Sequence, residues 1–142
     1  MRKRTLSREA AIKILYAWDI KGDSMEDCFD NYWNHVEPIE GDVKAFSEEL
    51  VMGVEKHHAE IDAAITRYAS NWKMDRMATI DRNVMRLATF ELLFSDDVPP
   101  KVAINEAIDL AKRFGDKDSS KFVNGVLDKI NKTEVEKDNC EV

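Results

Sequence analysis

The chain has 142 residues, of which 44% are hydrophobic and 35% are charged, and its formal net charge is −7. This composition suits one globular domain, or two small subdomains that share a core. No apolar run is long enough to cross a bilayer, and charged residues between Arg8 and Lys13 interrupt any apolar signal segment. The two cysteines, Cys28 and Cys140, form no disulfide framework, so we expect a cytoplasmic protein.

Apolar residues in the first half recur every three or four positions, which predicts helices. Four helices are predicted here, over residues 7–22, 24–36, 42–54 and 58–70. Ser7 is placed as the N-cap of the first helix, and Ser24 with Asp27 resembles a capping box for the second. The residues expected on the inner face of the first helix are Ala11, Ile14, Leu15 and Trp18.

The second half contains the segment with the strongest burial signal, a helix predicted to begin near Ala78. It is apolar around nearly its whole circumference, which is typical of the centre of a bundle. Two further helices are predicted over residues 102–114, ending at Gly115, and 119–131. Without a strand pattern, the sequence predicts an all-α fold of seven helices, with one domain over residues 1–131 and a charged, flexible tail over 132–142.

Signatures of catalysis are missing from the sequence: there is no Gly-rich phosphate loop and no His-Glu-x-x-His pair. His57 and His58 are adjacent, so on a helix they point about 100° apart and cannot easily share a metal. Cys28 falls on an aromatic stripe, which favours packing. Glu91 lies on a buried stripe, where it is either a general base or a carboxylate bonded to backbone N–H groups or Asn105; we favour the structural role. The sequence therefore predicts a protein that is not an enzyme and that needs no metal or cofactor.

Positive charge is concentrated at the N-terminus, because residues 1–13 carry a net charge of +4 and the remainder −11. A basic tip on an acidic chain indicates a polyanion site, although a solvated terminus would look the same. Tyr16 follows Arg8 by two helical turns, and Phe122 lies next to Lys121 at the margin of an apolar face. Basic side chains beside aromatic rings are typical of single-stranded nucleic-acid sites, although each ring alone also fits core packing.

Four blocks of the second half, and one of the first, closely resemble the NusB family of transcription antitermination factors. The blocks are Trp72–Met77, Ile80–Leu92, Val98–Gly115, Asp118–Lys129 and, near the N-terminus, Arg8–Asp19. The resemblance covers nearly the whole chain and is weakest between Gly22 and Tyr68. It implies two small helical bundles packed around a buried central helix.

The same resemblance implies a binding function. The family binds the boxA element of nascent transcripts, chiefly ribosomal RNA leaders, together with NusE, a protein of the small ribosomal subunit, and helps RNA polymerase read through terminators. Two alternatives remain: a protein-interaction or dimerisation module without RNA binding, and a detached NusB-like domain of an RNA methyltransferase. The chain is expected to be a monomer or a homodimer.

The family's functional positions are carried over residue by residue. The residues assigned to RNA are Arg2, Lys3, Arg4 and Arg8 in the basic arm, Tyr16 on the first helix, and Lys121 and Phe122 on the last. Asp118 matches a position linked to the strength of the complex, and we assign it a tuning role because its charge repels phosphate. Asp81 is placed at the border with RNA or NusE.

Overall fold

The computed structural model describes residues 3–36 and 41–135, and over these ranges the chain is helical with no strand. The seven helices predicted from the sequence are confirmed. They are α1 (Lys3–Lys21), α2 (Met25–Asn34), α3 (Gly41–Lys56), α4 (His58–Tyr68), α5 (Thr79–Phe94), α6 (Pro100–Phe114) and α7 (Ser119–Ile130), with a 3₁₀ turn η1 (Met74–Arg76) and a π-helical segment η2 (Asn131–Val135). The chain forms two compact units, residues 1–56 and 57–142.

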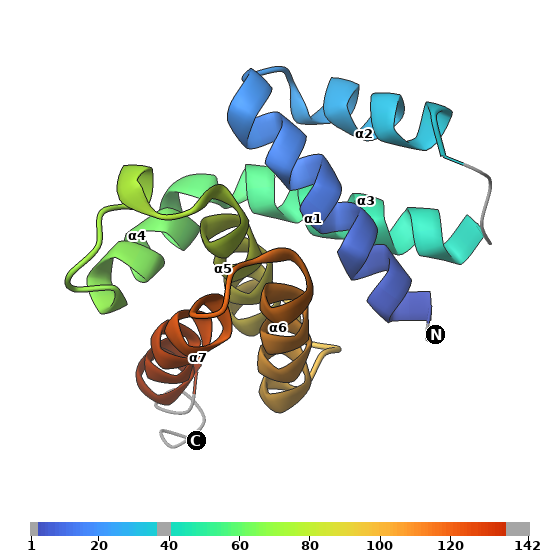
Figure 1. The fold of residues 1–142 in the computed structure, drawn as a ribbon. Helices are drawn as coiled ribbons and strands as arrows, with labels where there is room; N and C mark the ends of the chain where they lie inside the picture. The colour runs from blue at the N-terminus through green and yellow to red at the C-terminus, as the bar shows by residue number, and fades with distance from the viewer. Residues whose placement is uncertain (1–2, 37–40, 136–142) are drawn as a thin grey trace. The chain divides into compact units, whose positions relative to one another are not determined.

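The first unit consists of α1, α2 and α3, and each of these helices packs against the other two (Figure 1). Its core contains the apolar residues expected from the periodicity, including Ile14, Leu15 and Leu50, whereas Trp18 is only half-buried. The capping prediction for α2 is confirmed, because the Asp27 N–H donates to Ser24 Oγ at 3.1 Å.

The start of α1 differs from the prediction, because the helix begins at Lys3 and takes in the basic segment before Ser7. Ser7 is buried inside the helix, with its hydroxyl 2.8 Å from the Val43 carbonyl oxygen and 3.1 Å from that of Lys3. The serine resembles an N-cap in sequence, but its hydroxyl contacts the backbone of α3. Lys3, Arg4 and Arg8 therefore belong to one helix and do not form an extended arm.

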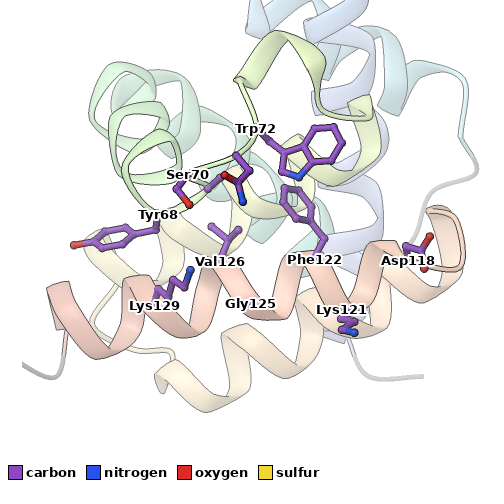
Figure 2. A pocket seen from close by; sticks show the side chains of 11 residues that line it. Tyr68, Ser70, Trp72, Asp118, Lys121, Phe122, Gly125, Val126 and Lys129 are labelled. Carbon is purple, nitrogen blue, oxygen red and sulfur yellow. The ribbon is translucent and has the colours of Figure 1, made fainter.

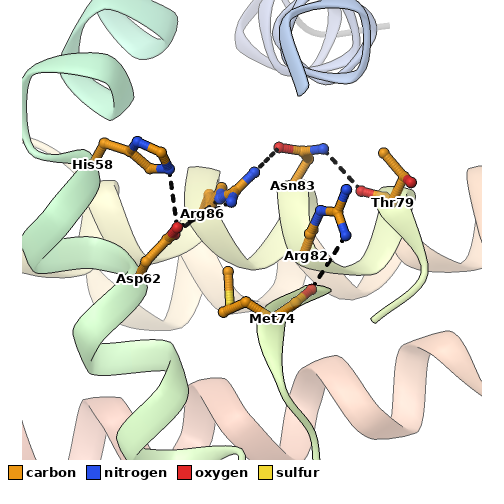
Figure 3. Close-up of polar contacts among 7 residues, drawn as sticks. All are labelled: His58, Asp62, Met74, Thr79, Arg82, Asn83 and Arg86. Carbon is orange, nitrogen blue, oxygen red and sulfur yellow. Dashed lines mark hydrogen bonds and ion pairs between the residues drawn. The ribbon is translucent and has the colours of Figure 1, made fainter. Parts of the chain in front are cut away.

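The second unit is built around α5, which packs against α4, α6, α7 and η2. Eleven of its residues are buried, as its apolar circumference predicted. Buried polar residues of α5 help to join it to α4: the Arg86 guanidinium donates to both Asp62 oxygens at 2.9 and 3.0 Å and to Asn83 at 3.0 Å (Figure 3). His58 Nε2 lies 2.9 Å from the same Asp62 carboxylate, so one acidic group connects two basic side chains.

Gly115 follows α6 as predicted, and its N–H donates to the Ala111 carbonyl at 2.9 Å. The usual reason for glycine after a helix, a positive φ, does not apply here, because the φ of Gly115 is −96° and is accessible to any residue. A Cβ at this position would lie 2.4 Å from Ser119 Oγ and 2.8 Å from the Ala111 carbonyl oxygen. Glycine is needed because α7 starts so close to the end of α6.

The segment expected to be a flexible tail begins at Lys132, and its first four residues lie in η2. Glu134 in this segment accepts hydrogen bonds from Arg67 at 2.6 Å and from the Tyr68 hydroxyl at 2.8 Å. Residues 136–142 lie outside the described residues. Among the helices described, none combines the length and the apolar character that a membrane span requires.

Candidate nucleic-acid interface

The basic end of α1 packs along α3. Lys3 Nζ forms an ion pair with Asp42 Oδ2 at 3.1 Å, and the Arg4 guanidinium lies 4.4 Å from the centre of the Phe46 ring. The hydrogen bond from Lys3 holds the pKa of Asp42 below its usual value. A hollow of about 320 Å³ lies here, lined by both basic residues but also by Asp42 and Glu49. Arg2, the fourth basic residue assigned to RNA, lies outside the described residues.

Arg8 does not occupy the exposed position that the sequence suggested. It is only 3% exposed, and its guanidinium lies 5.6 Å from the centre of the Phe46 ring. Helical spacing correctly places Arg8 and Tyr16 on the same helix, but it does not show that α3 supplies a ring beside Arg8. Arg8 therefore stabilises the packing of α1 on α3 in this structure and does not present its charge at the surface. Tyr16 is exposed as predicted, at 42%.

The start of α7 carries the second predicted group. Lys121 is exposed, and Phe122 is half-buried with its ring in an edge-to-face arrangement with Trp72, at a centroid distance of 6.2 Å and an interplanar angle of 68°. Trp72 comes from the segment between α4 and α5 and is 54% exposed (Figure 2). We call these two residues the aromatic pair. Two flat apolar surfaces therefore meet beside a lysine.

A pocket of about 450 Å³ lies on one side of the aromatic pair. We call it the basic pocket, because Lys121 and Lys129 both line it together with Gly125 and Val126 of α7 (Figure 2). Tyr68 lines its other end, and its hydroxyl is fixed by Glu134 of η2. The lining of this cavity therefore combines aromatic and lysine residues.

A second pocket, of about 330 Å³, shares the aromatic pair and Asp118 with the first. We call it the acidic pocket. The charged residues that line it are Arg76, Asp81, Asp116 and Asp118. Asp118 is the N-terminal flanking residue of α7, and its N–H donates to Asp116 Oδ1 at 2.9 Å. The structure therefore places both residues assigned to tuning or partner binding, Asp81 and Asp118, in one cavity next to Phe122.

Asp81 is the least solvated of these acids, being 8% exposed. Burial raises the pKa of its carboxyl group, and the charge of Asp116 raises it further, while a hydrogen bond from Ser119 acts in the opposite direction. Its Oδ1 atom is buried and has no hydrogen-bond partner. The site thus contains a buried acceptor that its protein surroundings leave unsatisfied.

Three of the side chains considered for catalysis or metal binding are buried or stacked on a ring. Cys28 is buried in the first unit, and burial raises the pKa of its thiol, which disfavours the reactive thiolate. The His57 ring stacks on Phe94 at a centroid distance of 3.8 Å, and Glu91 is buried on α5. Within residues 3–36 and 41–135, no three side chains of His, Cys, Asp or Glu form a group suited to a metal ion.

Comparison with known proteins decides the family. The NusB family model matches residues 5–132. The chain belongs to the NusB family. A transcription antitermination protein NusB from Anaeromyxobacter dehalogenans (strain 2CP-1) is 48% identical over 128 residues, which cover 90% of this chain and 89% of the relative. The NusB protein of Bacillus velezensis is 43% identical over 135 residues, which cover 94% and 98% of the two chains.

Solved NusB structures have the same fold. T. maritima NusB superposes with a TM-score of 0.87 at 36% identity, covering 100% of this chain and 99% of the other. A chain from the crystal structure of antitermination factors NusB and NusE in complex with dsRNA gives a TM-score of 0.85 at 32% identity, covering 93% and 98%. The resemblance noted in the sequence, and the all-helical NusB fold it implied, are therefore confirmed.

Trp72 is a residue of the site that the sequence did not indicate. Its neighbours are polar, because it lies in the run Ser70-Asn71-Trp72-Lys73 between two helices. An aromatic residue in a polar connecting segment does not belong to the apolar face of a helix. This feature could have indicated that Trp72 is available to a ligand. Its partner Phe122 lies fifty positions away, so the pairing itself depends on the packing of α7 against the end of α4.

Proposed function

We propose that this NusB-family protein is a transcription antitermination factor that binds boxA RNA of nascent ribosomal transcripts together with NusE. Its function is binding without covalent chemistry, and its place of action is the cytoplasm. The single observation that carries this proposal is the match of the NusB family over residues 5–132. This range includes every site residue named above except Arg2, Lys3 and Arg4.

Three features of the structure support an RNA role. The exposed cations Lys3, Arg4 and Lys121 are suited to phosphates, and the exposed ring of Tyr16 is suited to an unstacked base. A complex of another NusB protein with NusE and dsRNA has been crystallised, and the matching chain of that structure shares 32% identity with this one. Because Arg8 is buried, we assign it to supporting α1 and not to direct contact with RNA.

NusE is the partner that the charge distribution favours. The chain after residue 13 carries a net charge of −11, and a ribosomal protein is suited electrostatically to an acidic surface. The partner then supplies part of the affinity that a few cationic side chains cannot supply alone. The two groups of residues, on α1 and on α7, are proposed to contact the same RNA molecule.

The proposal is tested by measuring boxA RNA binding by fluorescence anisotropy with and without NusE, against a scrambled RNA of equal length. We expect tighter binding of boxA with NusE present, and an affinity that falls steeply as salt is raised, because bound phosphates release counterions. Equal affinity for boxA and the scrambled RNA under both conditions would overturn the function. Crosslinking of the RNA exclusively to residues 56–67 would overturn the assigned surface.

A further inference from the structure

The aromatic pair separates two cavities of opposite charge. The basic pocket has Lys121 and Lys129 in its lining, whereas the acidic pocket has Asp81 and Asp116 in its lining. Trp72, Phe122 and Asp118 line both cavities. A ligand that crosses the aromatic pair therefore meets two lysines at one end and Asp81 and Asp116 at the other, with ring surfaces and Asp118 between them.

The Asp81 carboxylate in the acidic pocket is short of hydrogen-bond donors. The Ser119 hydroxyl has a single hydrogen, and it lies 3.3 Å from Asp116 Oδ1 while also serving as the hydrogen-bond donor to Asp81. It cannot satisfy both carboxylates at once, and Asp81 Oδ1 has no partner. A buried acceptor without a donor destabilises the fold. The ligand that suits this pocket brings N–H groups.

Two kinds of N–H donor suit this pocket. The three aspartates in its lining outnumber Arg76, so an arginine side chain of a partner protein is one of them. The neighbouring lysines and the exposed ring of Trp72 favour a nucleotide, because lysines suit its phosphates and its neutral base stacks on aromatic rings. Among the RNA bases, guanine presents two neighbouring donors, N1–H and N2–H₂, on its Watson–Crick edge. Two parallel donors match the two oxygens of one carboxylate.

We propose that the acidic pocket receives one guanine base of the RNA, with Asp81 accepting its Watson–Crick N–H groups and the aromatic pair flanking the base. Turning of the Asp81 carboxylate about its last bond presents both oxygens to the base. The phosphates next to this nucleotide stay on the other side of the aromatic pair, at Lys121 and Lys129. The inference rests on the proposed function and adds a specificity-determining residue to it.

The test compares boxA RNA with derivatives in which inosine or adenosine replaces each guanosine in turn, bound to the protein with NusE. Inosine lacks only the N2 amino group. We expect one position at which inosine weakens binding about tenfold, the cost of one charge-assisted hydrogen bond. In Asp81→Asn the loss caused by inosine falls below twofold. The loss caused by adenosine also shrinks, because an asparagine amide complements the N6–H₂ and N1 groups of adenine.

The matched control is Asp109→Asn, an equal change of charge at an exposed position of α6 outside both pockets. It is expected to keep the discrimination of the wild type, and thermal melting checks that both variants are folded. Discrimination that is absent from the wild type, or unchanged in Asp81→Asn, overturns the guanine site while boxA binding and the proposed function stand. A variant that loses NusE affinity and keeps its base discrimination shows that the pocket holds a basic protein side chain, which also overturns it. Failure of the wild type to bind boxA with NusE overturns both proposals.

Discussion

The two regions that carry the proposed RNA-binding residues, the first turns of α1 and the start of α7, differ in how their cationic side chains are engaged. On α1, Lys3 is paired with Asp42, and both Arg4 and Arg8 lie over Phe46. On α7, Lys121 is exposed and lines a pocket with aromatic walls. The basic run that is most conspicuous in the sequence is thus the one whose charges already have partners. Formal charge along a chain is a poor guide to the charge that a surface offers to a ligand.

The largest expected effect is a loss of stability at the start of α7. Gly115→Ala places a Cβ against Ser119 and the Ala111 carbonyl, at the point where α7 begins. We expect the free energy of unfolding to fall by about 1–3 kcal/mol, measured by chemical denaturation. The RNA contacts proposed at Lys121 and Phe122 should weaken more than those proposed at α1. Stability equal to that of the wild type would show that this close approach is not a constraint.

Gly125→Ala is the matched control, because a Cβ at this exposed position of α7 meets nothing within 4 Å. Alanine inside a helix is favoured over glycine by about 0.5–1 kcal/mol, so this variant should be slightly more stable than the wild type.

Removal of a ring at the α7 region tests whether stacking or charge dominates there. Phe122→Ala should weaken boxA binding by about 1–3 kcal/mol, which is typical for the loss of one base–aromatic contact. The dependence of affinity on salt should stay as in the wild type, because no phosphate contact is removed. Phe122→Leu separates the flat ring from general apolar packing. Full affinity in both variants would remove Phe122 from the interface.

Removal of a positive charge at the α1 region should, in contrast, change the salt dependence of RNA affinity. Lys3→Ala is expected to reduce the slope of log affinity against log salt by about 0.7, the value for one phosphate contact on a single strand. Asp42→Asn should increase RNA affinity slightly, because Lys3 can then bind a phosphate without first losing its ion pair with Asp42. An unchanged slope in Lys3→Ala would show that the ion pair with Asp42 persists in the complex.

The smallest effect is a pair of pH dependences of opposite sign. The pKa of Asp42 is lowered in the folded protein, so its ion pair stabilises the fold above the unfolded value of about 3.9 and is lost as pH falls through the folded pKa. The pKa of Asp81 is raised, so its contribution is fully present below about 3.9 and is lost as pH rises through the folded pKa. Asp81→Asn should therefore raise the melting temperature at neutral pH and lose this advantage in acid. Asp42→Asn should slightly lower the melting temperature at neutral pH and have no effect in acid.

The helices could be predicted from the sequence because apolar residues recur every three or four positions within each of them. The inward residues of α7 (Val123, Val126, Leu127 and Ile130) are all buried, as the spacing required. Predictions from local sequence patterns were wrong where a side chain contacts a residue that is distant in the sequence. Ser7 was expected to cap a helix and instead contacts the backbone of α3, and Arg8 was expected at the surface and is buried beside Phe46.

The candidate site could be predicted in part for the same reason. Lys121 and Phe122 are neighbours in sequence, so their combination was visible, and the resemblance to the NusB family added Asp81 and Asp118. The cavity that joins Asp81 to Asp118 depends on the packing of α5 against α7, which no local pattern encodes. Trp72 was overlooked because its polar neighbours gave it no helical face.

The position of Trp72 also makes the protein an optical reporter of its own binding site. The chain has three tryptophans, and Trp72 is the only one after residue 56. Trp33 is constrained by a hydrogen bond from its indole to Ser47 Oγ at 3.1 Å, whereas the Trp72 indole is 54% exposed beside the proposed guanine site. Its emission is accessible to soluble quenchers, and a bound base would shield it. Titration of unlabelled RNA can then be followed by the intrinsic fluorescence of Trp72. The variant Trp72→Phe, which keeps only the emission of Trp18 and Trp33, is the reference.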